Sequence, residues 1–462
     1  MVVGGNRDGR NATGGAFRMQ GGLCIVGVNA IFDALRTGHT MDRRRFVRRS
    51  GGLVGAALLA PRLAESELAA PAQQPGPLAA LQPLPPVPPI TEAERRGRIE
   101  KARRLMSENG IDAMFLEGGT SMFYFTGVRW GNSERTFGVV IPAKGELAWV
   151  TPGFEESRAR ELIKFSNDVR VWQEDESPYA VIAKILRDRG AATGTIGIEE
   201  RTRFFIFDGV RQLLPQAKFV NAMPVTAGCR MFKSAAEIAL MQRANDITLQ
   251  ALGASFKTLK EGMTQQELSS TVGEATRKLG GVGDGALVIF GKYTAFPHGS
   301  IQPQKLHAGD VVLIDAGCTV DGYASDITRT TVFGKPTQRQ RDVWDVEKRA
   351  QSAAFAAAQL GATCESVDAA ARKVITAAGF GPDYKLPGLP HRTGHGIGLD
   401  GHEWTNFVRG NTTKIQPGMC FSDEPTIVIF GEFGIRLEDC LHMTESGPKM
   451  FTPQSPSIEQ PV

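Results

Sequence analysis

Residues 313–330 read LIDAGCTVDGYASDITRT, and this stretch decides the fold of the second half of the chain. An apolar, strand-like run ends at Asp315, and Asp326 follows eleven residues later. Taken alone, an acid before Ala-Gly is more often a turn former than a ligand. Asp321-Gly322 lies between the two acids and is typical of a hairpin turn, so both carboxylates are predicted to lie side by side on paired antiparallel strands.

A histidine-rich stretch follows at residues 391–403, HRTGHGIGLDGHE, with His391, His395 and His402. On a helix the first two would share one face, as in zinc peptidases, but three interleaved glycines disfavour a helix and no HExxH motif is present. A loop or sheet edge that brings backbone close to a ligand fits the glycines better. Three of the chain's seven histidines in so short a window are unlike core packing.

Two further acids, Glu424 in SDEPT and Glu438 in GIRLEDC, stand in apolar strand-like runs. An unpaired acid there would be expensive, which predicts a cationic partner. With Asp315, Asp326 and His395 they make four carboxylates and an imidazole, enough to hold two divalent cations. Oxygen-rich ligation without thiolates favours Mn²⁺, Fe²⁺ or Co²⁺, and a pair of such ions sharing one water is suited to hydrolysis.

The chain has 462 residues, of which 42% are hydrophobic. This length and this hydrophobic fraction are ordinary for a globular protein of two domains. The net charge is +4, but residues 1–70 hold ten Arg against five acids, so the remainder is nearly neutral. Such a body gives no electrostatic reason to expect nucleic acid as a partner. The cysteines form no CxxC or zinc-finger spacing, which predicts small buried residues without a disulfide framework.

The basic leader is typical of an export address. Arg43 and Arg44 precede Phe46-Val47 and the uncharged run 50–60, an arrangement that resembles a twin-arginine signal. That run is too short to span a bilayer, so no stable membrane insertion is expected. Residues 1–40 are interpreted as an over-long start before Met41, and the export route predicts a periplasmic location. The alternative is a plain basic arm on a cytoplasmic protein.

Residues 71–90 form a Pro-rich linker and are predicted to be an extended tether. Beyond it, Thr91-x-x-Glu94 is a capping box that begins a helix, and strand-like and helical runs then alternate to about Pro224. This pattern predicts an α/β domain without a catalytic cluster. Ser234-x-x-Glu237 and Thr264-x-x-Glu267 cap two helices of a second domain, which becomes strand-rich after residue 286 and carries every proposed ligand.

At this point the motifs carry a resemblance. Residues 232–452 resemble the catalytic domain of the creatinase/prolidase/aminopeptidase P group of metallopeptidases, and residues 91–225 are similar to that group's N-terminal domain. The resemblance implies an α+β fold, with a pita-bread catalytic domain preceded by a smaller creatinase-like α/β domain. It also implies short proline-containing peptides as substrates, and a homodimer or homotetramer.

The resemblance further assigns roles to individual residues. It implies that Asp315 and Asp326 hold one metal, while Asp326 and Glu438 bridge to a second that His395 and Glu424 complete. Glu424 would also be a proton shuttle. The remaining matches are His298 and His402 at the substrate carbonyl, His391 in the substrate pocket, Arg436 as an orienting arginine and Tyr323 in a supporting position. One departure is that Thr426 stands where the family has glycine after Glu-Pro, which affects the expected pocket shape.

The predicted function is a hydrolase that cleaves the peptide bond before proline, as an Xaa-Pro aminopeptidase or Xaa-Pro dipeptidase. Mn²⁺ is the expected metal, with Fe²⁺, Co²⁺ and Zn²⁺ as alternatives. Two other hypotheses stay open: a different C–N hydrolase or lyase on the same scaffold, and a non-catalytic binding protein. Loss of ligands would favour either, and none of the five is lost. Glycine-rich segments lack a Walker lysine and no GxSxG occurs, which disfavours a nucleotide-binding protein or a serine hydrolase.

Overall fold

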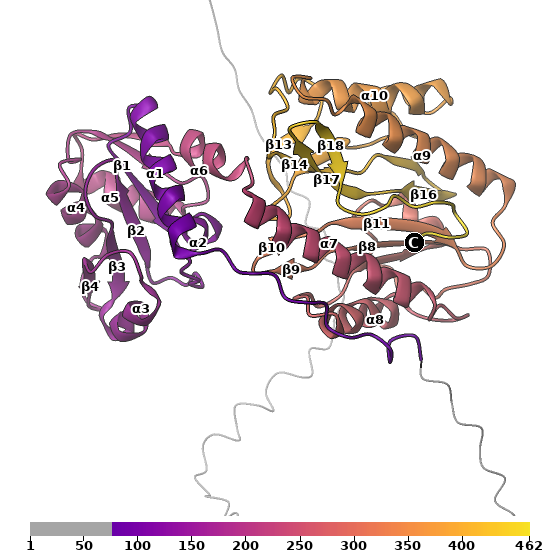
Figure 1. Ribbon diagram of the computed structural model, residues 1–462, viewed down its shortest axis with the longest axis horizontal. Helices are drawn as coiled ribbons and strands as arrows, with labels where there is room; N and C mark the ends of the chain where they lie inside the picture. The colour runs from indigo at the N-terminus through magenta and orange to yellow at the C-terminus, as the bar shows by residue number, and fades with distance from the viewer. Residues whose placement is uncertain (1–75) are drawn as a thin grey trace, which may run out of the picture. The chain divides into compact units, whose positions relative to one another are not determined.

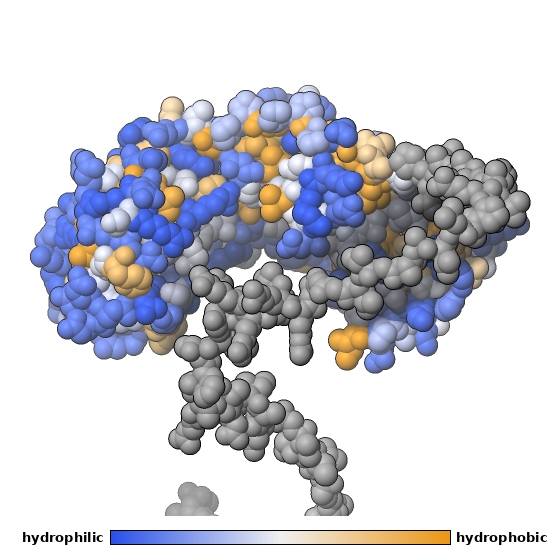
Figure 2. Space-filling view, turned by 90° about the horizontal axis from the view of Figure 1, so that it is seen from below, coloured by the Kyte–Doolittle hydropathy of each residue, from blue (hydrophilic) through white to orange (hydrophobic). Residues whose placement is uncertain are grey.

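A computed structural model describes residues 76–462, which fall within one unit spanning Gln73–Val462. The predicted export signal at Arg43 and Arg44 lies outside these residues. Among the residues described, no helix is both long and apolar enough to cross a bilayer. The face seen in Figure 2 is mostly hydrophilic, with apolar residues in small separate patches.

The N-terminal half is built on a six-stranded mixed sheet in the order β4-β3-β2-β1-β5-β6. Its strands are β1 (Ala113–Glu117), β2 (Gly138–Pro142), β3 (Ala148–Pro152), β4 (Val169–Trp172), β5 (Thr195–Ile198) and β6 (Lys218–Asn221). The helices are α1 (Glu92–Glu108), α2 (Thr120–Thr126), α3 (Glu156–Leu162), α4 (Pro178–Asp188), α5 (Phe204–Leu213) and α6 (Met223–Arg230), with a short 3₁₀ turn at Gly153–Glu155.

Alternation along the central strand β1 divides this half into two cores. Met114 and Leu116 belong to the core that α1 and α6 cover, whereas Ala113 and Phe115 belong to the core under α4 and α5. Because successive side chains of a strand point to opposite faces, a strand in which every residue is buried indicates a sheet covered on both sides. The α/β architecture predicted for this domain is therefore confirmed.

The Pro-rich segment differs from its prediction. Residues 77–80 form a turn, in which the N–H of Ala79 donates to the carbonyl of Gly76 at 2.8 Å, and residues 81–90 have no regular secondary structure. The described part is not a free tether, because Leu78, Leu81 and Leu84 pack against a buried cluster that includes Leu279. The backbone N–H of Leu84 also donates to the carbonyl of Leu279 at 3.0 Å.

The second half begins with two capped helices, α7 (Ala235–Phe256) and α8 (Gln265–Lys278). Both predicted capping boxes are present: Ser234 pairs with Glu237 and Thr264 with Glu267, each through reciprocal side-chain and backbone hydrogen bonds. A second helix pair, α9 (Gln338–Ala357) and α10 (Cys364–Ala377), lies later in the chain.

The strands between and after these helices form four sheets. A three-stranded sheet has the order β11-β8-β7, a five-stranded sheet the order β13-β12-β14-β17-β18, and two-stranded ribbons join β9 to β10 and β15 to β16. The strands between α8 and α9 in the chain are β7 (Leu287–Phe290), β8 (Val311–Ala316), β9 (Thr319–Val320), β10 (Tyr323–Ala324) and β11 (Ile327–Val332), with a 3₁₀ turn at Gly291–Ala295. The strands after α10 are β12 (Gly394–Gly396), β13 (Glu403–Phe407), β14 (Cys420–Asp423), β15 (Thr426–Ile429), β16 (Phe433–Arg436), β17 (Asp439–Thr444) and β18 (Gly447–Met450).

In Figure 1 these strands lie between the α7/α8 pair and the α9/α10 pair. Two apolar clusters agree with this view, since one joins α8 to β7 and β8 and the other joins α9 and α10 to β14, β16 and β17. This layered arrangement is the pita-bread fold. The described cysteines, Cys229, Cys318, Cys364, Cys420 and Cys440, are all buried.

Candidate active site

The two aspartates of the predicted site are brought together by a strand pair. β8 and β11 are antiparallel, and their register sets Asp315 opposite Thr328, two residues beyond Asp326. The chain reverses through the β9–β10 ribbon, where Asp321 and Gly322 have φ of 47° and 89°. These positive φ values are those that an Asp-Gly turn accommodates, so the predicted hairpin is confirmed.

The five predicted ligands converge on a cavity of about 430 Å³. Their ligand atoms form overlapping groups, within each of which all atoms lie within 4.8 Å of one another: Asp315, Asp326 and Glu438; His395, Glu424 and Glu438; and Asp326, His395 and His402. Asp326, His395 and Glu438 each belong to two groups. A carboxylate has two oxygens and can be shared between two ions, whereas the neutral imidazole of His395 offers one lone pair, so Asp326 and Glu438 are the residues suited to bridge.

His395 is held in one tautomer by its own strand. Its Nδ1 lies 3.0 Å from the carbonyl oxygen of Gly396, and since a carbonyl only accepts, Nδ1 carries the proton. Nε2 is then a free lone pair, 3.3 Å from Glu424 Oε1 and 3.7 Å from Asp326 Oδ2. A neutral imidazole facing carboxylates in this way is a metal-ligand arrangement.

The glycines around His395 have a steric reason. A Cβ on Gly394 would lie 2.1 Å from the carbonyl oxygen of Ser422, because β12 runs between β13 and β14. The prediction of a loop or a sheet edge here was wrong, since β12 is an interior strand. The glycines allow a close approach to the backbone of a neighbouring strand, whereas the prediction was an approach to a ligand.

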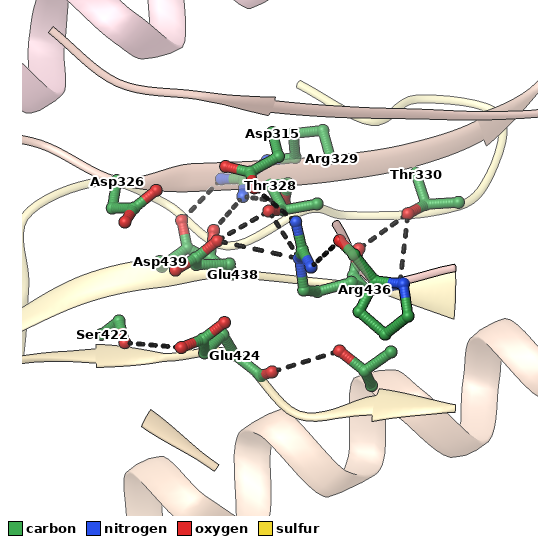
Figure 3. Close-up of polar contacts among 12 residues, drawn as sticks. Asp315, Asp326, Thr328, Arg329, Thr330, Ser422, Glu424, Arg436, Glu438 and Asp439 are labelled. Atoms are coloured by element: carbon green, nitrogen blue, oxygen red, sulfur yellow. Dashed lines mark hydrogen bonds and ion pairs between the residues drawn. The ribbon is translucent and has the colours of Figure 1, made fainter. Parts of the chain in front are cut away.

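A second layer of polar side chains orients the carboxylates (Figure 3). Thr328 donates to Glu438 Oε2 at 2.6 Å, and Arg436 Nε donates to the hydroxyl of Thr328 at 2.9 Å. Arg436 Nη2 also donates to Asp315 Oδ2, while Ser422 donates to Glu424 Oε1 at 3.3 Å. Arg436 is thus a buried cation that orients an acid, as predicted.

Charge compensation by the protein is incomplete at this cluster. Burial raises the pKa of Asp326, and the neighbouring Asp315 and Glu424 raise it further. Burial likewise raises the pKa of Glu438, and it raises that of Glu424 to about 7 although Arg436 opposes this shift. Burial lowers the pKa of His395 to about 3, so the imidazole is neutral. Arg392 also lines the cavity and, with Arg436, lowers the pKa of Glu424. Four crowded carboxylates against two arginines and a neutral imidazole fit a pair of divalent cations.

Three other predicted histidines line the same cavity: His298, His391 and His402. The ring of His402 stacks on that of His395 with centroids 3.9 Å apart. His391 Nε2 lies 3.1 Å from the hydroxyl of Thr426, the residue that departs from the family pattern. The hydroxyl of Thr426 is therefore a hydrogen-bond partner that orients the ring of His391 in the pocket.

Tyr323 is the one predicted site residue that the structure does not bring to the cavity. Its hydroxyl donates to Glu237 Oε1 at 2.8 Å and accepts from Arg98 Nη2 at 3.1 Å. The side chain is buried in the apolar cluster of Leu240 and Ile397. We therefore correct its role from a supporting position at the site to a contact between α1, α7 and β10.

Sequence reasoning missed two residues. Thr328 lies on β11, which begins directly after Asp326, and side chains at i and i+2 of an extended chain share a face, so alternation could have identified it. Arg392 lines the cavity, and its Nη2 lies 2.7 Å from His402 Nδ1. Its position within the histidine-rich stretch was the available signal.

A pita-bread fold whose cavity gathers four carboxylates and a histidine defines a metallohydrolase of the dinuclear type. Residues 239–445 match the family model described as "Metallopeptidase family M24", and residues 98–232 match the family model described as "Creatinase/Prolidase N-terminal domain". The chain belongs to metallopeptidase family M24, and it is a hydrolase.

Relatives support this assignment along nearly their whole length. The chain is 31% identical over 368 residues to an Xaa-Pro dipeptidase of Lactobacillus delbrueckii subsp. lactis, which covers 78% of this chain and 98% of the relative. It is 32% identical to an Xaa-Pro dipeptidase of Pyrococcus furiosus, over 77% of this chain and 97% of that one. Among solved structures, a recombinant prolidase from Thermococcus sibiricus is similar with a TM-score of 0.72 and 28% identity, covering 79% of this chain and 98% of the other.

Proposed function

We propose that the chain hydrolyses the amide bond that precedes proline in short peptides, with two divalent ions held by Asp315, Asp326, His395, Glu424 and Glu438. The observation that carries this proposal is the group of buried carboxylates around the neutral Nε2 of His395, within one cavity with three further histidines. The similarity to proteins named Xaa-Pro dipeptidase supports the proline specificity. Because oxygen ligands predominate, we propose Mn²⁺ as the resident metal.

Two divalent ions, when bound, supply a water made nucleophilic near neutral pH and a Lewis acid for the substrate carbonyl. Glu424 is the group that accepts a proton from the attacking water and returns it to the leaving proline nitrogen. An Xaa-Pro amide has no N–H and a fixed φ, so this nitrogen offers no hydrogen bond to a binding site. Recognition therefore rests on contacts to the carbonyl and to the ends of the substrate.

His402 and His298 are proposed to donate to the substrate carbonyl as negative charge develops on its oxygen. The tautomer of His402 follows from its neighbour. A guanidinium only donates, so Nδ1 of His402 accepts from Arg392 and its proton is on Nε2. Nε2–H is then the donor available to the carbonyl.

The test is an assay of the purified chain with and without added Mn²⁺. We expect hydrolysis of Ala-Pro that a chelator removes and added metal restores, with little hydrolysis of Ala-Ala. Asp326→Ala should abolish turnover, and His402→Ala should reduce it strongly. Equal turnover of Ala-Pro and Ala-Ala would remove the proline claim, and turnover that survives complete metal removal would contradict the metal claim.

We also propose that Arg43 and Arg44 direct export through the twin-arginine route, which places the enzyme in the periplasm. Replacing both by Lys should leave the protein in the cytoplasm, whereas unimpaired secretion of that variant would contradict the proposal. A homodimer or homotetramer is proposed as the working form. Light scattering coupled to size exclusion would measure it, and a monomer would contradict it.

A further inference from the structure

His402, the residue proposed to donate to the substrate carbonyl, lies in a segment without regular structure. Residues 398–402, here called the histidine loop, lie between β12 and β13 and form only bends. Gly398 and Gly401 are two of these residues, and glycine leaves a chain many conformations unless other contacts restrict it. A donor in such a loop needs contacts from elsewhere in the fold to stay in one place.

The ring of His402 contacts only its own stretch of chain among the interactions described above. Nδ1 accepts from Arg392 Nη2 at 2.7 Å, and the ring stacks on that of His395. These contacts orient the ring once the loop is in place. The backbone that carries the ring is held by other residues of the loop.

Asp400 joins the histidine loop to the N-terminal half. Its Oδ1 accepts from the hydroxyl of Thr120 at 2.7 Å, and its Oδ2 accepts from Arg230 Nη2 at 2.6 Å. Arg201 Nη1 lies 3.1 Å from the same Oδ2. Thr120 begins α2, Arg230 ends α6 and Arg201 follows β5, so three separate places of the N-terminal half meet one carboxylate. That side chain is 17% exposed, so solvent screens these pairs less than it screens surface pairs.

Arg230 contacts both sides of His402. Its Nη2 donates to Glu403 as well as to Asp400, so one guanidinium joins the residues two before and one after His402. Glu403 also accepts from two backbone N–H groups of the histidine loop, at 2.9 and 3.1 Å. Arg230 is in turn held within the N-terminal half, since its Nη1 donates to the hydroxyl of Ser121 at 3.3 Å. The loop is therefore closed around a cation that the N-terminal half supplies.

An apolar contact adds to the polar ones. Leu399 packs against the core of the N-terminal half that includes Tyr124 and Val128. It also packs against the cluster of Tyr323 and Ile397 in the second half. The histidine loop therefore lies between two cores and contacts both.

We propose that Asp400 and Arg230 are positioning residues, through which the N-terminal half holds His402 at the substrate carbonyl. This inference rests on the proposed function, since it takes His402 as the carbonyl donor. An N–H group stabilises charge on a developing oxyanion only at hydrogen-bond distance, and a displacement of about 1 Å can cost about 10²-fold in rate. The N-terminal half, for which no catalytic cluster is predicted, thus contributes to the chemistry through the loop that it holds.

The experiment is a double-mutant cycle between Asp400 and His402, measured as kcat/KM for Ala-Pro with the Mn²⁺-loaded full chain. Asp400→Ala should lower kcat/KM by about 10- to 100-fold, mainly through kcat. In a His402→Ala background the same substitution should lower it by less than about 2-fold, because the donor to be positioned is gone. Thr120→Val keeps the side-chain shape and removes one hydrogen bond, so it should cost less, about 2- to 10-fold.

Hydrogen exchange gives a second readout that needs no turnover. In Asp400→Ala, the backbone amides of residues 398–403 should exchange faster than in the wild type by about 10-fold or more, while bound metal stays at the wild-type value. Asp400→Asn should show a smaller increase, because Thr120 keeps an acceptor. The matched control is Glu174→Gln, which removes a carboxylate paired with Arg135 within the N-terminal half and should change neither the kinetics nor the exchange of the loop.

Two results would overturn the inference. One is an Asp400→Ala variant with the wild-type kcat/KM, or with a loss that is the same in both backgrounds, since Asp400 would then act independently of His402. The other is wild-type exchange of the histidine loop in Asp400→Ala, since the N-terminal half would then not hold it. Failure of the proposed function is distinguishable, because the wild type would then leave Ala-Pro intact whatever the exchange of the loop.

Discussion

Two groups of buried carboxylates in the catalytic half have opposite surroundings. The side chain of Glu403 is 5% exposed; Lys233 Nζ lies 3.1 Å from its Oε2, and Arg230 contacts its Oε1. Burial alone would raise its pKa, but Lys233 and Arg230 lower it to about 2. At the proposed metal site, burial raises the pKa of Asp326 and Glu438, and Arg436 is the one protein cation that opposes it there.

The difference shows that burial alone does not mark a metal site. Hydrogen-bond donors are present at both places, since Glu403 accepts from the N–H groups of Leu399 and Asp400 and Glu438 accepts from Thr328. What separates them is whether the fold supplies cations of its own. At Glu403 the fold supplies two, and the carboxylate is structural. At Asp326 and Glu438 the fold supplies fewer cationic side chains than there are carboxylates, so divalent ions can balance the remaining negative charge.

The largest expected effect is on catalysis. Asp326→Asn keeps the shape of the side chain but removes a charge and one ligand oxygen from two of the ligand groups. We expect turnover of Ala-Pro to fall by at least about 10³-fold, the scale of losing a catalytic electrostatic group, and bound metal to fall below two ions per chain. Kinetics and elemental analysis measure the two effects.

Glu403→Gln is the control for that substitution, because it changes a buried carboxylate without touching the ligand set. Metal content should stay at the wild-type value. A variant at Glu403 that lost metal as completely as Asp326→Asn would remove the distinction between the two groups.

The next largest effect is on stability. Glu403→Gln leaves Lys233 buried without its anion, and breaking a buried pair in this way costs about 3–5 kcal/mol. The folded pKa of about 2 is below the ordinary value of 4.5, so the pair stabilises the protein above pH 4.5 and this contribution is lost as pH falls toward 2. Urea unfolding should therefore show a large difference between variant and wild type at pH 7 that shrinks below pH 4.5. A difference that stayed constant over this range would argue against a charge effect.

Local sequence was sufficient for much of the site. Asp315 and Asp326 were predictable because a hairpin turn joins two strands within one short stretch, and spacing alone fixes their proximity. Tyr323 was not predictable in this way, since its partner Arg98 lies 225 positions away and no periodicity links the two.

The same limit applies to the fold. Amphipathic elements such as α7 were evident from capping and periodicity, and the apolar runs indicated β8, β11 and β15, whereas β12 was expected to be a loop or a sheet edge. Helix α2 was not, because almost all its residues are buried and a short apolar run has no helical period to detect. Long-range packing decides such elements, and a single sequence does not display it.

A third prediction concerns pH and the metal-free protein. The pKa of Glu424 is raised to about 7 from an ordinary value of 4.5, the opposite direction from Glu403. A raised pKa means that stability is fully present below pH 4.5 and is lost as pH rises through 7. The chelated protein should therefore lose about 2–3 kcal/mol between pH 5 and pH 8. Calorimetry of chelated and Mn²⁺-loaded samples tests this, and the loaded sample should lack the loss because the ions balance the charge.

The smallest expected effect comes from a further buried acid, Glu347 on α9. Neither of its carboxylate oxygens has a hydrogen-bond partner among the described residues, and burial together with Asp423 raises its pKa. As for Glu424, a raised pKa means that Glu347 destabilises the folded protein once pH rises above the ordinary carboxyl pKa of 4.5. Glu347→Gln in Mn²⁺-loaded protein should gain about 1 kcal/mol at pH 8 and nothing at pH 4, because a neutral side chain avoids a buried charge. If the variant instead lost several kcal/mol of stability at pH 8, a cation of the protein would have to stabilise the Glu347 carboxylate, as Lys233 and Arg230 stabilise that of Glu403.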